Sequence, residues 1–553
     1  MPERKRQPES TSARRADAAL LALDRRFGVA GAGRELIRKA FPAHWSFLLG
    51  ELALYSLIVL VLTGTYLTLF FDPGMSRAPY HGSYGPLHGV DVSKAFSATL
   101  RISFDVRGGL LIRQIHHWAS LLFLAAIGAH LLRVFFTGAF RRPREGNWVI
   151  GLTLFLLGLV EGFCGYSLPD DLLSGTGLRI AYGILTSIPV LGTYLASFLF
   201  GGEAPGADII PRLYVVHILF VPGLLIALAV LHVQLVVRLK HTQWSGPGKH
   251  NRNSVGHAFF PHFSAQSGGL FFMVFGVLSL LGALGQINPV WNYGPYVPDQ
   301  VSTAAQPDWY VGFLEGSLRL MPPFETTLWG HTVMWNVFVP AVLLPFLLFT
   351  CLYLYPFLER WISGDTGEHH LCDRPRNQAT RTAFGTAGLT FYAVLLLAGG
   401  NDVLASTFAV SLNGLTWTFR ALLVLAPVGA FLATKRLCLA LQEHDRQRLT
   451  EGEETGRVRA SVAGAMVPGH RALPGDTRYT LLAQDVPRPQ PPAAAREESG
   501  HAARVRRVRG ALNLWYYRDR VELPLSERQR AQITARSRGV PHQQSERERE
   551  ADE

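Results

Sequence analysis

The chain has 553 residues, of which 48% are apolar, with a positive mean hydropathy and a formal net charge of +12. Soluble domains need a polar exterior, so this combination argues against an ordinary soluble enzyme and favours a membrane protein. The basic residues cluster between apolar segments and in the terminal arms, which argues against a nucleic-acid partner. The four cysteines form no CxxC or CxxCH pattern, so a c-type haem, an iron–sulfur cluster and a disulfide framework are not expected in this chain.

Apolar segments long enough to cross a bilayer recur along most of the chain, each near the roughly 20 residues that a span requires. Eight spans are predicted, at 45–71, 110–136, 147–167, 213–239, 268–285, 332–355, 382–400 and 415–436. The charged N-terminal arm lacks the apolar stretch of a signal peptide. The predicted fold class is an all-α, multi-span transmembrane helix bundle.

Lys and Arg are unevenly divided between the two sides of this bundle. The basic residues on one side number 22, in the arm 1–40 and the loops 133–147, 238–267 and 359–381. Those on the other side number seven, in the loops 72–107, 167–212, 286–331 and 401–414. Basic loops stay in the cytoplasm, so the chain is expected to be multi-pass with both termini cytoplasmic.

The domain organisation follows from these spans. A cytoplasmic basic arm, 1–40, precedes a four-span unit, 41–267, and a second four-span unit, 268–440, that contains the long outer loop 286–331. The segment 177–200 is a helical run broken at Pro189, and both outer segments are expected to roof a cavity or, alternatively, to anchor at the interface. The tail 441–553 has few apolar clusters and is predicted to be mostly extended, although the patch 511–524 has the aromatic residues to dock on a partner.

Four histidines lie inside the second and fourth spans, His116 and His130 in one, His217 and His232 in the other. Spacings of fourteen and fifteen residues leave each pair within roughly 40° to 60° of one helix face and about 21 to 22 Å apart. Both spans run in the same direction, so His116 is level with His217 and His130 with His232. This arrangement predicts two bis-imidazole haem sites between these spans. Hydrogen bonding between helices is the alternative, and His117 points about 100° away from the haem face.

The flanking spans carry glycines at a matching spacing. Gly50 and Gly64 are fourteen residues apart on the first span, as are Gly151 and Gly165 on the third. Glycines at the two histidine levels would let a flat macrocycle approach the backbone, whereas ordinary small-residue helix packing is the alternative.

Two arginines, Arg113 and Arg133, each lie three residues from a predicted haem ligand. A guanidinium group there can pair with a haem propionate, or it can simply anchor the helix at the interface.

Asp308, in the outer loop, lies between a proline and two aromatic residues at the outer histidine level. A carboxylate there suits the acceptor of a quinol proton, and an exposed turn aspartate is the alternative.

Several motifs resemble those of the cytochrome b family of bc complexes over about residues 40–440. They are RQIHHW (113–118), HLLR (130–133), RPRE (142–145), GYSLP (165–169), RLY (212–214) with His217, and PDWY (307–310). The resemblance implies a low-potential haem b on His116 and His217 and a high-potential haem b on His130 and His232. It also implies a quinone or menaquinone substrate and an enzyme complex with quinol:cytochrome c oxidoreductase activity.

The resemblance further implies an outer quinol site with Tyr166, Gly177 and Tyr310 beside Asp308, flanked by Pro307 and Trp309 in the PDWY motif. It implies a Rieske iron–sulfur protein and a c-type cytochrome as partner subunits, commonly a dimer of the complex, and admits a terminal oxidase. Such a complex would oxidise quinol outside, reduce quinone inside and translocate protons across the bacterial cell membrane.

The sequence departs from the family pattern at two places, and no usual ligands of the inner quinone site are evident in 238–269. Asp308 replaces the usual glutamate, and Asp170-Asp171 stands where Trp-Gly is common. With the undivided chain and the long tail, these departures resemble the actinobacterial menaquinol branch.

Two other functions fit the intramembrane histidines. A proton-coupled transporter could use histidine and aspartate as a relay, but it would bind no iron. A cytochrome b that anchors a dehydrogenase would be expected to lack the outer PDWY site.

Overall fold

The computed structural model describes residues 39–482, apart from 203, 205, 301–305, 329 and 463, and residues 500–538. In the N-terminal arm it describes only the isolated positions 22, 26, 33 and 37, so the predicted arm 1–40 lies almost entirely outside the described residues.

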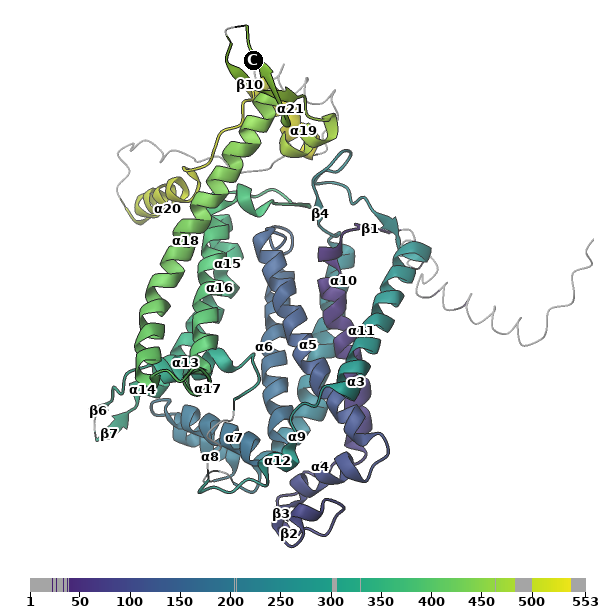
Figure 1. Cartoon of the computed structure of the whole chain (residues 1–553), viewed down its shortest axis with the longest axis vertical. Coiled ribbons are helices and arrows are strands. Elements are labelled where there is room, and N and C mark those ends of the chain that lie inside the picture. Colours follow the sequence, from purple (N-terminus) through teal and green to yellow (C-terminus); the bar gives the residue numbers. More distant parts are fainter. Residues whose placement is uncertain are drawn as a thin grey trace, which may run out of the picture.

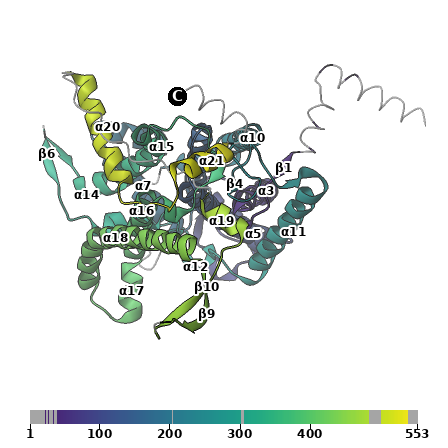
Figure 2. The ribbon, with the colours of Figure 1, turned by 90° about the horizontal axis from the view of Figure 1, so that it is seen from above.

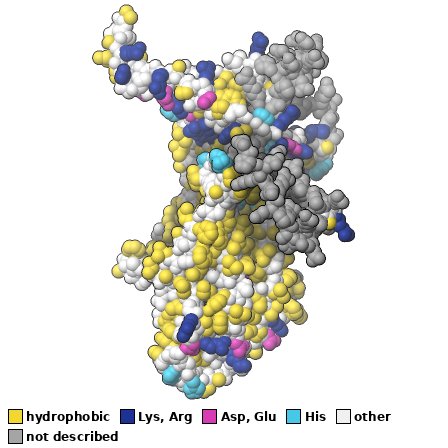
Figure 3. All heavy atoms as spheres, turned by 90° about the vertical axis from the view of Figure 1, so that its right-hand side faces the viewer, with side chains coloured by type: hydrophobic (Ala, Val, Ile, Leu, Met, Phe, Trp, Pro, Cys, Tyr) yellow, Lys and Arg dark blue, Asp and Glu magenta, His cyan; other side chains and the backbone are white. Residues whose placement is uncertain are grey.

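Eight helical segments of the described chain are long and apolar enough to cross a membrane, as predicted. They are α3 (Leu49–Thr68), α5 (Gly109–Phe136), α6 (Glu145–Ser167), α9–η3–α10 (Ile209–Arg238), η4–α11 (Phe259–Leu284), α14–η5–α15 (Trp335–Ser363), α16 (Ala379–Gly399) and α18 (Leu412–Glu451). They run side by side (Figure 1), and a broad apolar zone on the surface separates two zones that carry charged side chains (Figure 3). The multi-span helical fold is confirmed.

The spans form two groups that lie side by side and share the same two faces. Helices α3, α5, α6, α10 and α11 lie together, and α15, α16 and α18 lie beside them with the short helix α13 (Gly312–Leu320) (Figure 1). The loops 137–144, 239–258 and 364–378 define what we call the upper face, and the opposite ends define the lower face. Because α11 packs against α3 and α5, the predicted division at 267/268 separates a span from the helices that it contacts.

The lower face is covered by short elements between the spans. The helices there are α4 (Lys94–Phe104), α7 (Leu172–Thr186), α8 (Gly192–Phe200), α12 (Val290–Tyr293), α13 and α17 (Asn401–Phe408). The strand pairs there are β2 with β3 (Arg77–Pro79, Asp91–Ser93) and β6 with β7 (Thr326–Leu328, His331–Val333). The expected break at Pro189 lies between α7 and α8, where Val190 has a φ of 67°.

The upper face is held by two small strand pairs and a buried ion network. The pairs are β1 (Ala40–Phe41) with β5 (His257–Ala258) and β4 (Gln243–Trp244) with β8 (Leu371–Cys372). Arg381 is fully buried, lies 3.1 Å from Glu359 and also pairs with Asp373. Removing one partner of such a buried pair leaves an uncompensated charge, so this network fixes the 364–378 loop on the bundle.

The eighth span continues well beyond its predicted end at residue 436. Helix α18 runs to Glu451, so the predicted domain boundary at 441 falls inside it. Its polar last turns remain helical because they are paired: Asp445 lies 3.0 Å from Arg376, and Gln442 donates to the Arg376 carbonyl at 2.6 Å. A hairpin of β9 (Glu453–Ala460) and β10 (Met466–Arg471) and helix α19 (Gly475–Leu482) follow.

The tail also folds back on the membrane domain through α20 (His501–Tyr517), ahead of α21 (Glu527–Arg538). The buried Tyr516 hydroxyl lies 2.9 Å from the Tyr355 hydroxyl, and Asn513 donates to the Ile362 carbonyl at 2.9 Å. The prediction of a mostly extended tail is therefore wrong for its described residues. The patch 511–524 supplies the contacts that the rest of the tail lacks, and it docks on its own chain.

Candidate functional site

The four span histidines meet in two pairs, one near each face. The ring centroids of His116 and His217 are 6.1 Å apart, and those of His130 and His232 are 6.4 Å apart. A metal ion bound by one nitrogen of each ring at about 2 Å separates two imidazole centroids by about 6 Å. Both pairs therefore have the spacing of a bis-imidazole site, as the sequence predicted from their levels.

A π-helical turn explains how unequal spacings give matched pairs. His217 lies in η3 (Val216–Phe220), which is π-helical and absorbs one extra residue relative to an α-helix. The fifteen residues from His217 to His232 then act like the fourteen on α5. Pro222 follows η3 and has no N–H to bond to the preceding turn, so it is the sequence signal for this irregularity.

The four glycines lie against these histidine rings. A Cβ on Gly64 would lie 3.1 Å from His116, and one on Gly165 would lie 2.5 Å from His217. At the other level, a Cβ on Gly50 would lie 3.2 Å from His130, and one on Gly151 would lie 3.4 Å from His232. The predicted register is thus present, although the glycines make room for the imidazoles themselves. A side chain there would push the ligand ring toward the haem space.

Two polar residues orient the lower histidine pair, and sequence reasoning missed both. The Thr63 hydroxyl lies 2.9 Å from Nδ1 of His116, and Oε1 of Glu161 lies 2.9 Å from Nδ1 of His217. A partner on Nδ1 fixes the ring and leaves Nε2 for a metal. Glu161 is one turn before Gly165, so the i, i+4 rule places it on the histidine-facing side and would have found it.

Two buried guanidinium groups are incompletely satisfied, one at each level. Nε and Nη2 of Arg133 have no hydrogen-bond partner, and neither does Nε of Arg113, although Arg113 donates to the Asn288 carbonyl at 3.1 Å. Buried donors of this kind need an acceptor. A haem propionate would supply one at each level, so these residues fit the predicted cofactor.

Apolar side chains fill the space between the two levels. Phe123 and Leu124 lie midway between His116 and His130 in sequence and are buried with Leu57 and Leu225 in one cluster. This cluster excludes water between the sites and holds α3, α5 and α10 together.

The outer-loop carboxylate predicted at the quinol site lies beside the lower histidine pair. Oδ1 of Asp308 is 3.2 Å from Nε2 of His117, and the Tyr310 hydroxyl donates to Oδ2 at 3.0 Å. His117 directly follows His116 but was not predicted to be a haem ligand, because its side chain points away from the haem face. That side chain contacts Asp308. Burial raises the pKa of Tyr310 well above its ordinary value, so its phenol stays protonated and serves as a donor.

The other predicted quinol-site residues converge on the same place. A Cβ on Gly177 would lie 3.3 Å from the Tyr166 ring, so α7 and α6 meet there. The Tyr310 ring lies 6.0 Å from that of Trp309 and packs on α6 where Gly162 leaves room. Pro307 is partly buried beside Asp308. Aromatic rings and a carboxylate therefore lie together beside the lower histidine pair.

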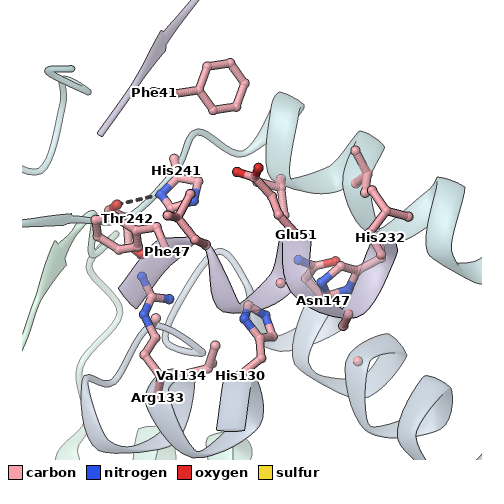
Figure 4. A pocket seen from close by; sticks show the side chains of 18 of the residues that line it. Phe41, Phe47, Glu51, His130, Arg133, Val134, Asn147, His232, His241 and Thr242 are labelled. Carbon is pink, nitrogen blue, oxygen red and sulfur yellow. Dashed lines mark hydrogen bonds between the residues drawn. The ribbon is translucent and has the colours of Figure 1, made fainter. Parts of the chain in front are cut away.

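A cavity of about 520 Å³ opens around the upper histidine pair (Figure 4). His130, His232 and Arg133 line it, and so do Glu51 and His241. The Arg133 guanidinium stacks 4.3 Å from the Phe47 ring centroid. Burial lowers the pKa of His241 to about 4, so this imidazole is neutral at physiological pH. The lining of the cavity extends beyond the histidine pair and is mostly apolar, as is typical of ligand sites.

Comparison with known proteins decides the family. A family model described as cytochrome b (N-terminal)/b6/petB matches residues 121–295. A cytochrome bc1 complex cytochrome b subunit from Streptomyces coelicolor is 51% identical over 504 residues, 91% of this chain and 92% of the relative. The chain belongs to the cytochrome b family of bc1 complexes. A cytochrome b subunit from Mycobacterium leprae is 51% identical over 82% of this chain and 82% of its own length. One from Corynebacterium diphtheriae is 47% identical over 82% of this chain and 83% of its own length.

This membership makes the chain a subunit of a quinol:cytochrome c oxidoreductase, and the predicted actinobacterial branch is confirmed. A solved chain described as hyperthermophilic respiratory Complex III has the same fold, with a TM-score of 0.56 at 20% identity, covering 76% of this chain and 98% of its own. A proton-coupled transporter and a dehydrogenase anchor are no longer needed to explain the histidines.

The aspartates that depart from the family pattern have structural roles in this cytochrome b. Asp171 is the N-cap of α7 and accepts from the Leu173 N–H at 3.2 Å and the Ser174 hydroxyl at 2.6 Å. Asp170 has a φ of 55°, and burial raises the pKa of both carboxyls to about 6. The cap fixes the start of the helix that carries Gly177 to Tyr166.

Proposed function

We propose that this cytochrome b binds two b haems between α5 and the α9–η3–α10 span. His116 and His217 would hold the low-potential haem at the lower face, and His130 and His232 the high-potential haem at the upper face. Arg113 and Arg133 would pair with propionates. Six-coordinate haem supplies reversible one-electron transfer without an open position for a ligand. The centroid distances of 6.1 and 6.4 Å support this assignment.

The lower-face cluster would oxidise menaquinol. Tyr166, Gly177 and Trp309 would position the quinol ring, and Asp308 would accept a proton from its hydroxyl. The observation that carries this proposal is the 3.2 Å contact between Asp308 and His117, the neighbour of His116. This contact supports Asp308 as the proton acceptor next to the lower haem, where one electron of the quinol would enter the chain.

One electron of the quinol would pass to an iron–sulfur partner, and the other would cross the membrane to the upper site and reduce quinone there. Release of protons at the lower face and uptake at the upper face would couple the reaction to proton translocation. The partners would be a Rieske iron–sulfur subunit and a c-type cytochrome, in a dimeric complex that can join a terminal oxidase. A menaquinol:cytochrome c assay on the purified complex, with haem reduction followed optically, tests this function.

The upper face would be the cytoplasmic one, because it carries most of the basic residues. We expect a cysteine replacing the exposed Arg457 in β9 to react with a membrane-impermeant maleimide only in sealed inside-out vesicles of the cell membrane. A cysteine replacing the exposed Glu325, in the lower-face loop, should react only in right-side-out vesicles. The opposite labelling pattern would reverse the orientation while leaving the fold unchanged.

A further inference from the structure

We propose that Glu51 donates the protons that a quinone takes up in the upper cavity. The proposal rests on the proposed reduction of quinone at that face. Glu51 directly follows Gly50, whose backbone lies against the ring of His130. It therefore stands next to the site from which electrons would reach the quinone (Figure 4).

The Glu51 carboxyl group is held from two helices. The Ser267 hydroxyl, on α11, donates to Oε2 at 2.6 Å, and the Tyr55 hydroxyl, one turn along α3, lies 3.3 Å from the same oxygen. Tyr55 and Ser267 are also hydrogen-bonded to each other. Since both bonds fall on Oε2, Oε1 is the oxygen that can face a ligand.

Among the side chains of the cavity wall, Glu51 is the best suited to donate a proton. It is the only Asp or Glu among the described residues that line the cavity. Nδ1 of His241 is already engaged with the Thr242 carbonyl at 2.7 Å, and Arg133 stacks on Phe47. Aromatic and aliphatic side chains complete a wall suited to a quinone ring and its tail, among them Phe41, Leu48, Leu54, Phe259 and Phe263.

The proton balance is simple. Reduction of one quinone to quinol consumes two electrons, delivered one at a time from the His130/His232 site, and two protons. In each transfer the carboxyl O–H bond of Glu51 breaks and an O–H bond forms at a quinone oxygen. The carboxylate is then reprotonated from solvent, which reaches the cavity wall at the exposed His44 and His257.

The test compares Glu51→Gln with the wild-type complex, both reduced chemically and then mixed with menadione, a tail-less naphthoquinone. We expect haem re-oxidation by menadione to slow by about 10²-fold or more, the usual effect of losing a general acid. Ser267→Ala should slow it less, because the acid remains but loses its position. Ser264→Ala, one turn earlier on α11, should match the wild type. In infrared difference spectra, a carboxylic C=O band should shift when menadione binds to the wild type and be absent from Glu51→Gln.

Two outcomes separate this proposal from the function on which it rests. If menadione does not re-oxidise the wild-type haems, quinone reduction at the upper face is wrong. If it re-oxidises the wild type and Glu51→Gln equally fast, and the carboxylic band is unchanged, Glu51 is not the donor although the function stands.

An independent observation concerns α20, which lies at the edge of the bundle beside α15 (Figure 2). Its apolar side chains at a helical spacing are exposed, forming a stripe of Val505, Val508, Leu512 and Trp515. The Trp515 ring lies 5.9 Å from the Phe384 ring of α16. Thr380, one turn nearer the start of α16, donates to the backbone of α20 at 2.8 Å. The exposed side chains of this stripe therefore face the broad apolar zone on the surface of the bundle.

We infer that α20 binds anionic phospholipid at this interface. The exposed Arg504 and Arg507 flank the stripe on the side opposite Tyr516 by helix geometry, where long basic side chains reach phosphate groups while their stems cover apolar surface. Because the stripe continues the lipid-facing surface and its flank is positively charged, the matching occupant is a lipid with a negatively charged headgroup.

In the purified complex, Arg504→Gln/Arg507→Gln should weaken binding of spin-labelled phosphatidylglycerol by about 30-fold, since each basic residue near an anionic surface contributes about a fivefold preference. Binding of spin-labelled phosphatidylcholine should change little. Arg457→Gln/Arg459→Gln, on the β9 hairpin, removes the same charge away from the stripe and serves as the control. Equal phosphatidylglycerol binding by the two double variants, or capture of a protein subunit rather than lipid by a photo-crosslinker at position 512, would overturn the inference.

Discussion

Replacing His130 with leucine should reduce the haem content of the purified chain from two b haems to one. His130 and His232 together would form the upper site, and a single imidazole cannot hold six-coordinate haem there. His232→Leu should give the same spectrum as His130→Leu, because both variants lose the same haem. His116→Leu and His217→Leu should instead remove the lower haem and leave the upper one.

The measurement is a reduced-minus-oxidised optical spectrum with a haem-to-protein ratio for each variant. His262→Leu, an exposed histidine at the start of the fifth span, should keep both haems and controls for the substitution itself. His117→Leu should also keep both, because His117 contacts Asp308 rather than the partner histidine. Two haems retained in all four ligand variants would refute the bis-histidine assignment.

The two histidine pairs were predictable because helix periodicity converts sequence spacing into depth. Fourteen residues between glycines and between the α5 histidines fix the levels without tertiary information. The π-turn at His217 was not predictable from spacing, since an extra residue in a helix is invisible unless Pro222 is taken as its cause. The glycines were expected to face a macrocycle, and their contacts with the imidazoles depend on the relative rotation of packed helices.

Contacts between elements far apart in the chain explain the other gaps. The bond between Glu51 and Ser267 joins two spans that are 216 residues apart, and no local pattern links them. The tail was predicted to be extended because it has too few apolar residues for a core of its own. The lack of a separate core does not keep the tail extended, because Tyr516 and Asn513 are hydrogen-bonded to residues of the membrane domain.

Asp308→Asn should lower menaquinol:cytochrome c turnover by about 10²- to 10⁴-fold, the range expected when a general base is lost. Asparagine keeps the shape of the side chain and can still accept from Tyr310, but it cannot take a proton from the quinol. Both haems should remain, because neither hydrogen bond of Asp308 involves a ligand histidine. Asp299→Asn, an exposed aspartate in the same loop, should have wild-type turnover.

The pH profile separates a proton acceptor from a merely structural carboxylate. A carboxylate that takes the quinol proton makes turnover depend on pH, so the pH profile of kcat/KM should differ between the wild type and Asp308→Asn. Tyr310 cannot replace it, because burial raises the pKa of its phenol well above the ordinary value and keeps it protonated. Asp308→Glu, which restores the usual residue of the family, should keep most of the turnover and the wild-type pH profile. If Asp308→Asn retains near-normal turnover with an unchanged pH profile, the proton leaves through another group, and His117→Leu then tests the neighbour that lies 3.2 Å from the carboxylate.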